Sequence, residues 1–598
     1  MCGIAGFMLK NGAPASRDVL TRLANAMAHR GPDGEGFHIR GSVGLTQTRL
    51  AIVDLEGGDQ PLYQHANGSG VALVANGEIY NDPEIRRAIP DEQYQTGSDC
   101  ETPLRLYLRS GHEFTRQLRG MYAIAIDDPD ADRIVLVRDP FGIKPLYYTE
   151  TANGVFFASE AQALIRAGIL LPTIDTRVRT ELLQLQFTTG ADTIFKNIKR
   201  LLPGEMLVVT GGEIVERYRQ DPIPSPGTRG VTQEESISLL DDYLRESVEL
   251  HQRADVDYGM FLSGGIDSSA LLAMMGRLNV RPVQAFTIGF EGGDVHDERA
   301  AAGRVAASVG AEHECIAFGE SDFWRLLPDV ASAMDDPVCD YATLPTFKLA
   351  STARDAGLKV ILSGEGGDEM FAGYGRYRRA SRWRIFGGRP MRASGALDEL
   401  GLFLDKENEH PAFWRNGIAR SESHHRAAGR YGLQASQAVD MDDWLPHDLL
   451  TKLDRCLMAN GIEGRVPFVD PVMAEFAMRL PDRLKVRGGK GKWLLRQWLS
   501  KQFPTSEPFA PKKGFTVPVG AWISTKGEEL GNIVAESPSI EGFLDPVAIR
   551  SLFSRSEVEA NGKCGHAAWS LLFFALWYEA QFTSGRDGQL QQYLSTLQ

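Results

Sequence analysis

The sequence predicts a two-domain protein of mixed helix and strand, in which an α+β region precedes an α/β region built on a doubly wound parallel sheet. The first observation is the length of 598 residues, which is more than one hydrophobic core organises. The second is the alternation of Pro222, Pro224 and Pro226, which excludes helix or central strand and predicts an extended linker over residues 219–231. The third is the alternation of helices with short apolar strands after residue 232, a rhythm typical of parallel sheets.

The composition indicates a soluble cytoplasmic protein. Hydrophobic residues make up 43% and charged residues 24%, as in ordinary globular proteins, and the net charge of −14 argues against a surface that coats nucleic acid. Six scattered cysteines without metal-ligand spacing fit a reducing compartment. No stretch resembles a signal peptide or is apolar enough to span a bilayer. We therefore expect neither a nucleic-acid nor a membrane partner, and a homodimer stays open.

The N-terminal region begins with a cysteine that can act as a nucleophile. Removal of Met1 would expose the α-amine of Cys2, which titrates near ~8 and can take the proton of its own thiol. The apolar run after it predicts a strand over 4–9, followed by a helix over 17–28. Taken alone, a cysteine at position two is better explained as an accident of sequence.

Later polar residues in the same region supply what hydrolysis of an amino-acid amide requires. We expect Arg49, at the head of an apolar strand, to grip an α-carboxylate, and Glu78 with Asp99 to hold an α-ammonium. The side chain of Asn76 and the N–H of Gly77, in a turn that ends a strand over 71–74, can stabilise an oxyanion. Each has a plain alternative, since Asn-Gly is a common hairpin turn.

Together with Cys2 these stretches resemble the class II glutamine amidotransferase domain. The resemblance runs to about residue 210 and includes the motifs at 29–34, 138–147 and 158–160. It implies an Ntn-hydrolase-type αββα sandwich over residues 1–218, closed by a strand pair at 206–209 and 213–218. It also implies hydrolysis of glutamine through a Cys2 thioester, with glutamine bound by Arg49, Leu50, Val53, Asn76, Gly77, Glu78 and Asp99.

The second region carries a loop suited to phosphate. A strand over 258–262 stops at a Ser-Gly-Gly turn before a helix, so unpaired N–H groups and hydroxyls can face an anion. The loop lacks the lysine of a Walker motif and instead carries an acid, which indicates a bridging Mg²⁺. The residues concerned are Ser263, Gly264, Gly265, Asp267, Ser268 and Ser269. An ordinary strand–helix turn is the plain alternative.

A second strand end repeats the pattern. The run over 359–362 is followed by Ser363, Gly364, Glu365 and, after two glycines, Asp368. Two such turns in one sheet can place Asp267 and Asp368 on either side of a Mg²⁺–pyrophosphate group. The remaining strands of this sheet are expected over 284–290 and 312–316, and the helices over 232–251, 268–276, 297–308, 322–333 and 344–356, with a helical C-terminal part.

With both loops, the whole chain resembles the glutamine-hydrolysing asparagine synthetase family, whose second domain would be residues 232–598. The resemblance implies nucleotide contacts at Leu262, Ile288, Ser363 and Gly364, a role for Glu365 in forming an acyl-adenylate, and a pyrophosphate contact at Lys492, with Lys490 an alternative. It implies that ATP activates aspartate as β-aspartyl-AMP. Ammonia from glutamine would then displace AMP, and an apolar tunnel would carry it between the domains.

Two stretches limit the resemblance. The stretch over 335–345, which matches the family's acceptor-binding segment, has no arginine, so an amidotransferase acting on another carboxylate, such as a uronic acid, is a second hypothesis. A third is a non-catalytic regulator that binds glutamine or nucleotide. The segment 376–425 is assigned only to helical packing or an interface, and Glu463 with Arg465 to a structural pair.

Overall fold

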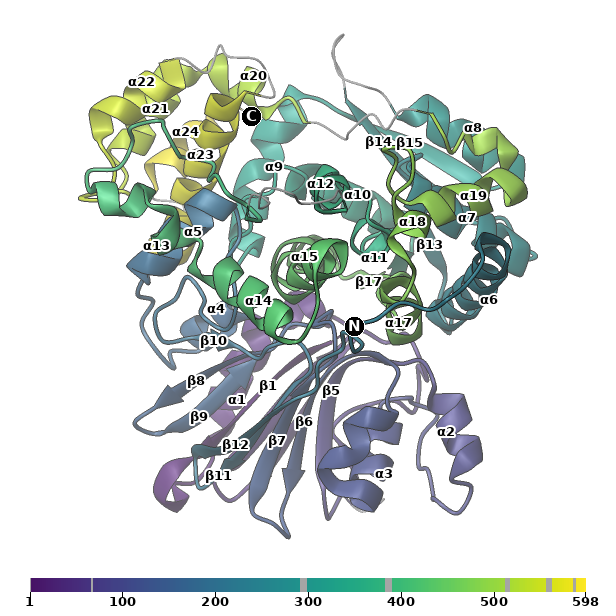
Figure 1. The fold of residues 1–598 in the computed structure, drawn as a ribbon. Helices are drawn as coiled ribbons and strands as arrows, with labels where there is room; N and C mark the ends of the chain where they lie inside the picture. The colour runs from purple at the N-terminus through teal and green to yellow at the C-terminus, as the bar shows by residue number, and fades with distance from the viewer. Residues whose placement is uncertain are drawn as a thin grey trace.

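The computed structural model describes residues 2–65, 68–290, 298–381, 390–510, 517–554, 562–583 and 588–597. Two stacked antiparallel sheets form one half of the molecule, and a parallel sheet surrounded by helices forms the other (Figure 1). The N-terminus lies where the two halves meet. The predicted fold class is confirmed.

The first half is a sandwich of two six-stranded sheets. One sheet has the order β10-β8-β9-β1-β3-β2 and the other β12-β11-β7-β6-β5-β4. Their strands are β1 Gly3–Leu9, β2 Gly34–Arg40, β3 Val43–Arg49, β4 Leu62–Tyr63, β5 Ala72–Ile79, β6 Gly120–Asp128, β7 Arg133–Arg138, β8 Tyr147–Thr151, β9 Gly154–Ala158, β10 Lys199–Arg200, β11 Glu205–Thr210 and β12 Glu213–Arg219.

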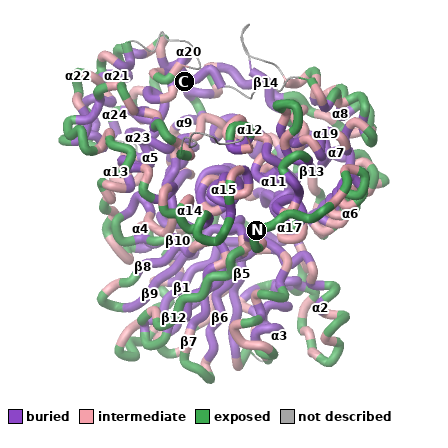
Figure 2. Tube along the Cα trace, in the orientation of Figure 1, coloured by how far each residue is buried: buried purple, intermediate pink, exposed green. Residues whose placement is uncertain are grey.

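Alternating side chains make this sandwich four layers deep. On β1, Ile4 faces the core between the sheets, whereas Phe7 faces the helix α1 (Arg17–Ala26). On β5, Val74 faces the inter-sheet core and Leu73 the helix α3 (Glu101–Ser110). Figure 2 shows the inner strands of both sheets buried along most of their length, whereas the edge strand β12 is largely exposed. The period of two in each strand therefore places every even residue of β1 and β5 in the space between the sheets.

The second half contains a five-stranded parallel sheet of order β15-β14-β13-β16-β17. Its strands are β13 Tyr258–Phe261, β14 Gln284–Phe290, β15 Glu312–Phe318, β16 Val360–Leu362 and β17 Glu463–Arg465. The strand order reverses between β13 and β16, and such a switch point is where parallel sheets bind ligands. The two predicted Ser-Gly loops follow these two strands.

Helices cover both faces of this sheet and form the C-terminal part. The helices that pack near the sheet are α6 Gln233–His251, α7 Ile266–Leu278, α8 Arg299–Val309, α9 Glu320–Ala333, α10 Thr343–Asp355, α11 Gly367–Phe371, α16 Leu450–Met458 and α19 Trp493–Gln502. A separate group consists of α20 Val519–Ser524, α21 Gly527–Ala535, α22 Pro546–Ser554, α23 Lys563–Phe582 and α24 Gln589–Ser595. Among the described residues no helix combines the length and apolarity needed to cross a bilayer.

Two sequence-based expectations about strands are wrong, and one strand was not predicted. The strand over 71–74 does not end in a turn at Asn76, because β5 continues through Gly77 and pairs with β6 along its whole length. Arg49 ends β3 instead of heading a strand; the apolar residues after it form a loop whose Ile52 carbonyl accepts from the N–H of Asp255 at 2.9 Å. The strand β17 was missed because its three residues include two charged ones.

The segment 376–425, which the sequence assigned only to helical packing or an interface, combines helices with irregular chain. Residues 376–381 and 390–425 contain the end of α12 (Gly375–Ala380), α13 (Pro411–Trp414) and most of α14 (Asn416–Ala427), whereas 382–389 lie outside the described residues. Between the halves, residues 220–232 belong to no helix or strand, and Thr232 caps α6 through a capping box with Glu235. The exact domain bounds stay a prediction.

Candidate functional site

The thiol site comprises Cys2, Arg49, Asn76, Gly77, Glu78 and Asp99, at one end of the inter-sheet space. Asn76 lies on β5 and Cys2 immediately precedes β1, and both continue the even-numbered series that faces the space between the sheets. The backbone N–H of Cys2 donates to Asn76 Oδ1 at 3.0 Å. Burial raises the pKa of the Cys2 thiol, although the Leu50 N–H bonded to it acts in the opposite direction. A base close to the sulfur is therefore needed to form the thiolate.

The amide of Asn76 and the backbone of Gly77 leave donors facing this site. Asn76 Nδ2 is buried and has no hydrogen-bond partner among the described residues. Along the same edge of β5, the N–H of Ala75 donates to Gln60 Oε1 and that of Ile79 to Asp99 Oδ2, so the N–H of Gly77 between them points to this edge as well. A Cβ on Gly77 would lie 2.2 Å from the Met121 carbonyl oxygen, so only glycine fits here.

Two carboxylates and an arginine lie beside these donors. Burial raises the pKa of Glu78 well above its ordinary value, and the neighbouring Asp99 raises it further. Burial also raises the pKa of Asp99, to about 6. Arg465, from β17 in the other half, reaches across with Nη2 at 3.3 Å from Glu78 Oε1. Two buried acids with one shared cation form a receptor for a further positive charge.

Arg49 is held by the loop that follows β3. Its guanidinium contacts Asp59 Oδ1 at 2.7 Å and donates to the carbonyl oxygens of Asp54 and Leu55. Val53 lies in the same loop and is half-buried. The structure therefore brings Arg49 to the rim of the thiol site, where its contacts are with the protein itself.

The phosphate-loop cavity is a cavity of about 800 Å³ at the switch point of the parallel sheet. Its lining includes most of the sequence-predicted nucleotide residues, namely Leu262, Ser263, Gly264, Gly265, Asp267, Ser268, Ile288, Ser363, Gly364, Glu365, Asp368 and Lys492. Ser269 is not among the lining residues; it is buried in α7. The φ angle of Gly264 is +69°, a left-handed conformation that favours glycine, and it forms the turn that exposes the N-terminus of α7.

Lys492 joins the two acids of the cavity. Its Nζ lies 2.6 Å from Asp368 Oδ1 and also pairs with Asp267 Oδ2. The ammonium keeps its charge there, because both carboxylates raise its pKa against the opposing effect of burial. Lys490 instead donates to the Phe509 carbonyl at 2.5 Å, outside the lining. The geometry thus favours Lys492 over Lys490 as the residue that meets phosphate.

Lys452 on α16 is a cavity residue that the sequence did not single out. Its Nζ contacts Asp340 Oδ2 at 2.7 Å and lies 4.0 Å from Glu365 Oε1. Burial raises the pKa of Glu365, and Lys452 is the cation that lowers it. A lysine on an amphipathic helix usually faces solvent, so its periodicity gave no signal of this position.

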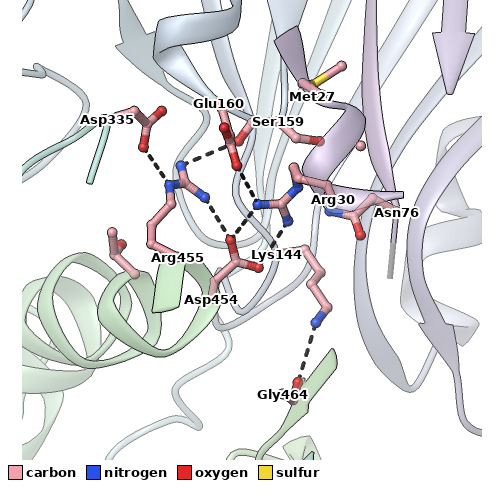
Figure 3. Close-up of polar contacts among 12 residues, drawn as sticks. Met27, Arg30, Asn76, Lys144, Ser159, Glu160, Asp335, Asp454, Arg455 and Gly464 are labelled. Atoms are coloured by element: carbon pink, nitrogen blue, oxygen red, sulfur yellow. Dashed lines mark hydrogen bonds and ion pairs between the residues drawn. The ribbon is translucent and has the colours of Figure 1, made fainter. Parts of the chain in front are cut away.

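A buried network of ion pairs joins the two halves between the thiol site and the cavity (Figure 3). Arg30 binds Asp454 with two N–H groups, at 2.8 and 3.1 Å, and Glu160 at 2.9 Å. Arg455 in turn contacts Asp454 at 2.7 Å and Asp335 at 2.5 Å. Arg30 Nε also donates to the Cys2 carbonyl at 3.2 Å, so this network positions the backbone of Cys2.

Comparison with known proteins matches both halves of the chain. The family model of the glutamine amidotransferase domain matches residues 1–219, and that of asparagine synthase matches residues 239–579. Glutamine-hydrolysing asparagine synthetase 1 of Bacillus subtilis is 30% identical, over 97% of this chain and 96% of its own length. Asparagine synthetase B of Escherichia coli is 29% identical, over 90% of this chain and 86% of its own.

Proposed function

Because the chain belongs to the asparagine synthase family, we propose that it is a glutamine-dependent asparagine synthetase. Glutamine and water give glutamate and ammonia at the thiol site, while aspartate and ATP give β-aspartyl-AMP and pyrophosphate in the phosphate-loop cavity. Ammonia then attacks the activated carbonyl and AMP leaves. The observation that carries the proposal is the pairing, in one chain, of a buried thiol–amide site with a cavity where Lys492 meets two carboxylates.

At the thiol site, the residues divide the work by charge. Once Met1 is removed, the α-amine of Cys2 takes the thiol proton, and the sulfur attacks the side-chain amide of glutamine. Asn76 Nδ2 and the Gly77 N–H stabilise the oxyanion, a contribution of typically about 10²–10³ in rate for one donor. Glu78 and Asp99 bind the α-ammonium, and Arg49 exchanges its protein contacts for the α-carboxylate.

In the phosphate-loop cavity, the acids and the lysine fit a nucleotide with Mg²⁺. Asp267 and Asp368 supply the carboxylate oxygens that Mg²⁺ prefers, and the metal typically needs only one or two of these besides phosphate. Bound there, Mg²⁺ would neutralise charge on the phosphates. Lys492 stabilises the departing pyrophosphate, and Glu365, beside Lys452, lies where the acyl-adenylate forms.

The region between the sites is suited to keeping ammonia neutral. One apolar cluster extends from Leu50, Ile52 and Ile143 of the first half to Leu453 and Leu457 of the second. Ammonia in bulk water at neutral pH is mostly ammonium, which is no nucleophile, so an enclosed apolar path preserves its reactivity. The tunnel itself stays a prediction. The relatives compared above favour aspartate over a uronic acid as acceptor.

One assay tests the proposal. The protein is incubated with glutamine, Mg-ATP and a series of acids that includes aspartate and a uronic acid, and release of AMP and pyrophosphate is measured for each. We expect release with aspartate, together with asparagine in equal amount. No release with aspartate, or faster release with the uronic acid, contradicts the proposal.

A further inference from the structure

Two ionisable side chains behind the phosphate-loop cavity, Asp448 and Arg392, lie near each other without forming an ion pair. Asp448 is 1% exposed, and neither of its carboxylate oxygens has a hydrogen-bond partner among the described residues. Nε and Nη2 of Arg392 are also buried and have no hydrogen-bond partner among the described residues. Burial raises the pKa of Asp448 well above its ordinary value, so Asp448 is a neutral carboxyl beside these unpartnered N–H groups. An unsatisfied buried polar group costs roughly 1–3 kcal/mol, and a ligand that bonds both side chains would remove that cost.

The guanidinium of Arg392 is held by aromatic rings stacked against its faces, whereas Nε and Nη2 on its N–H edge make no hydrogen bond to the described residues. Its guanidinium carbon lies 3.9 Å from the ring centroid of Trp444 and 4.9 Å from that of Phe187. Its backbone has a φ of +49°, a conformation that non-glycine residues rarely adopt and that is often found where a side chain is aimed at a ligand. The rings fix the plane of the guanidinium, and the N–H edge is the part suited to a carboxylate.

The pair is continuous with the wall of the cavity. Asp340 raises the pKa of Asp448 further, whereas the cations Lys452 and Arg392 lower it. Lys452 lines the cavity, and the charge of Glu365, which also lines it, reaches Asp448 as well. Trp444, Asp448 and Lys452 follow at intervals of four along one continuous helical stretch, so Asp448 lies between the turn on which Arg392 stacks and the turn of the cavity-lining Lys452. Arg392 and Asp448 are not themselves among the lining residues and lie behind Lys452.

We propose that Arg392 and Asp448 form the acceptor subsite and that they select an amino dicarboxylic acid. Arg392 receives the α-carboxylate, Asp448 the α-ammonium, and Lys452 draws the side-chain carboxylate towards the phosphates. The inference deepens the proposed function and rests on it. It also explains how the stretch 335–345 manages without an arginine, because the cation comes from residue 392 instead.

Truncated acids test each contact separately. Succinate lacks the ammonium of aspartate, and 3-aminopropanoate lacks its α-carboxylate. AMP formation is measured with Mg-ATP and ammonium chloride, which bypasses the thiol site, in the wild type, Arg392→Gln and Asp448→Asn. We expect the wild type to prefer aspartate over either analogue by about 100-fold or more in kcat/KM, since a site built for hydrogen bonds rejects ligands that lack them.

Each variant should weaken the preference for aspartate over one analogue and leave the preference over the other. Arg392→Gln should raise the KM for aspartate by about 10- to 100-fold, the range for a hydrogen bond to a charged group. Its preference over 3-aminopropanoate should fall below about tenfold, while its preference over succinate persists. Asp448→Asn should lose its preference for aspartate over succinate, while its preference over 3-aminopropanoate persists. A purely structural pair would lower both preferences equally or neither, and that outcome overturns the inference.

Controls separate folding and the proposed function from the subsite. Arg179 is a matched arginine away from the cavity, stacked 3.8 Å from the Phe543 ring centroid with a buried, unpartnered Nε, and Arg179→Gln should behave as wild type. Glutaminase activity of every variant reports on folding. If Arg392→Gln loses glutaminase activity, it is misfolded and does not test the subsite. The inference is then tested by the substrate preferences of Asp448→Asn and by whether Arg392→Lys partly recovers the KM for aspartate. If the wild type fails to activate aspartate, it is the proposed function that fails, and the subsite with it.

Discussion

The thiol site and the phosphate-loop cavity differ in how their charged groups are held. In the thiol site Asn76 stands on β5 and Cys2 immediately before β1, and the backbone of Cys2 is held by Asn76 Oδ1 and by Arg30. In the cavity Asp267 and Asp368 lie just after the ends of β13 and β16, and the flexible side chain of Lys492 pairs with both carboxylates. In the thiol site only Arg49, at its edge, is proposed to exchange contacts when a ligand arrives, whereas in the cavity the central ion pairs of Lys492 must themselves exchange partners when a nucleotide enters.

This difference follows from ligand size and from what must leave. Glutamine is small and reacts at one amide, so a buried site on strands positions it well. Under the proposed function, the cavity of about 800 Å³ must admit a nucleotide and an acid and release pyrophosphate. A lysine that moves from carboxylates to phosphate keeps the charge compensated at each stage.

The largest expected effect comes from a substitution that inactivates the thiol site and leaves the phosphate-loop cavity active. Cys2→Ala should abolish asparagine formation from glutamine, because no other thiolate attacks the amide, and should leave formation from ammonium salts intact. The measurement is asparagine produced from each nitrogen source, with Cys564→Ala as the control. Equal loss from both sources would show that the two sites do not work separately.

Removing a charge from the buried network should weaken the contact between the halves. Arg455→Met leaves Asp335 and Asp454 buried with one cation fewer, which typically costs about 3–5 kcal/mol. We expect both activities to be lost at lower temperature, followed by residual activity after heating. Lys10→Met removes an exposed pair with Glu213 and should change stability by about 0–1 kcal/mol. Similar heat sensitivity in the two variants would refute the assignment.

The exchange of partners by Lys492 is tested against its neighbour. Lys492→Gln should slow aspartate-dependent release of pyrophosphate by about 10²–10³, the typical effect of one group that stabilises a transition state. Lys490→Gln should change it little, since Lys490 bonds the Phe509 carbonyl. Glutaminase activity without ATP should be normal in both. An effect at position 490 as large as at 492 would contradict the geometry.

The smallest expected effect is a pH dependence confined to the thiol site. Burial raises the pKa of Asp99 to about 6 in the free protein, and only its ionised form attracts the ammonium of glutamine. As the pH falls through 6, Asp99 takes up a proton and the KM for glutamine should rise, by up to about tenfold per pH unit. Asp99→Asn should have a higher KM that no longer changes over this range. Glutaminase kinetics between pH 5 and 8 measure both, and an unchanged slope in Asp99→Asn would assign the titration elsewhere.

Much of the fold and of the thiol site could be predicted because their signals are local. The apolar runs of β1, β13 and β16 and the Ser-Gly loops stand out in the sequence. Asn76-Gly77 was misassigned to a turn because the preference of this dipeptide for turns is real, and only pairing with β6 overrides it. No local signal marks Lys452 or Arg392. The expected pair of Arg465 with Glu463 is confirmed, but the contact of Arg465 with Glu78 depends on a residue distant in the chain.

The strand β17 ties the chemistry of one half to the backbone of the other. The side chain of Arg465 reaches Glu78, and its carbonyl oxygen accepts from the N–H of Ser363 at 2.8 Å. The halves are therefore not interchangeable modules. A chimera that takes its first 218 residues from a relative must also inherit matching partners for Arg465, Asp454 and Arg455, so domain transplantation in this family should succeed only when both faces of the junction are moved as a set.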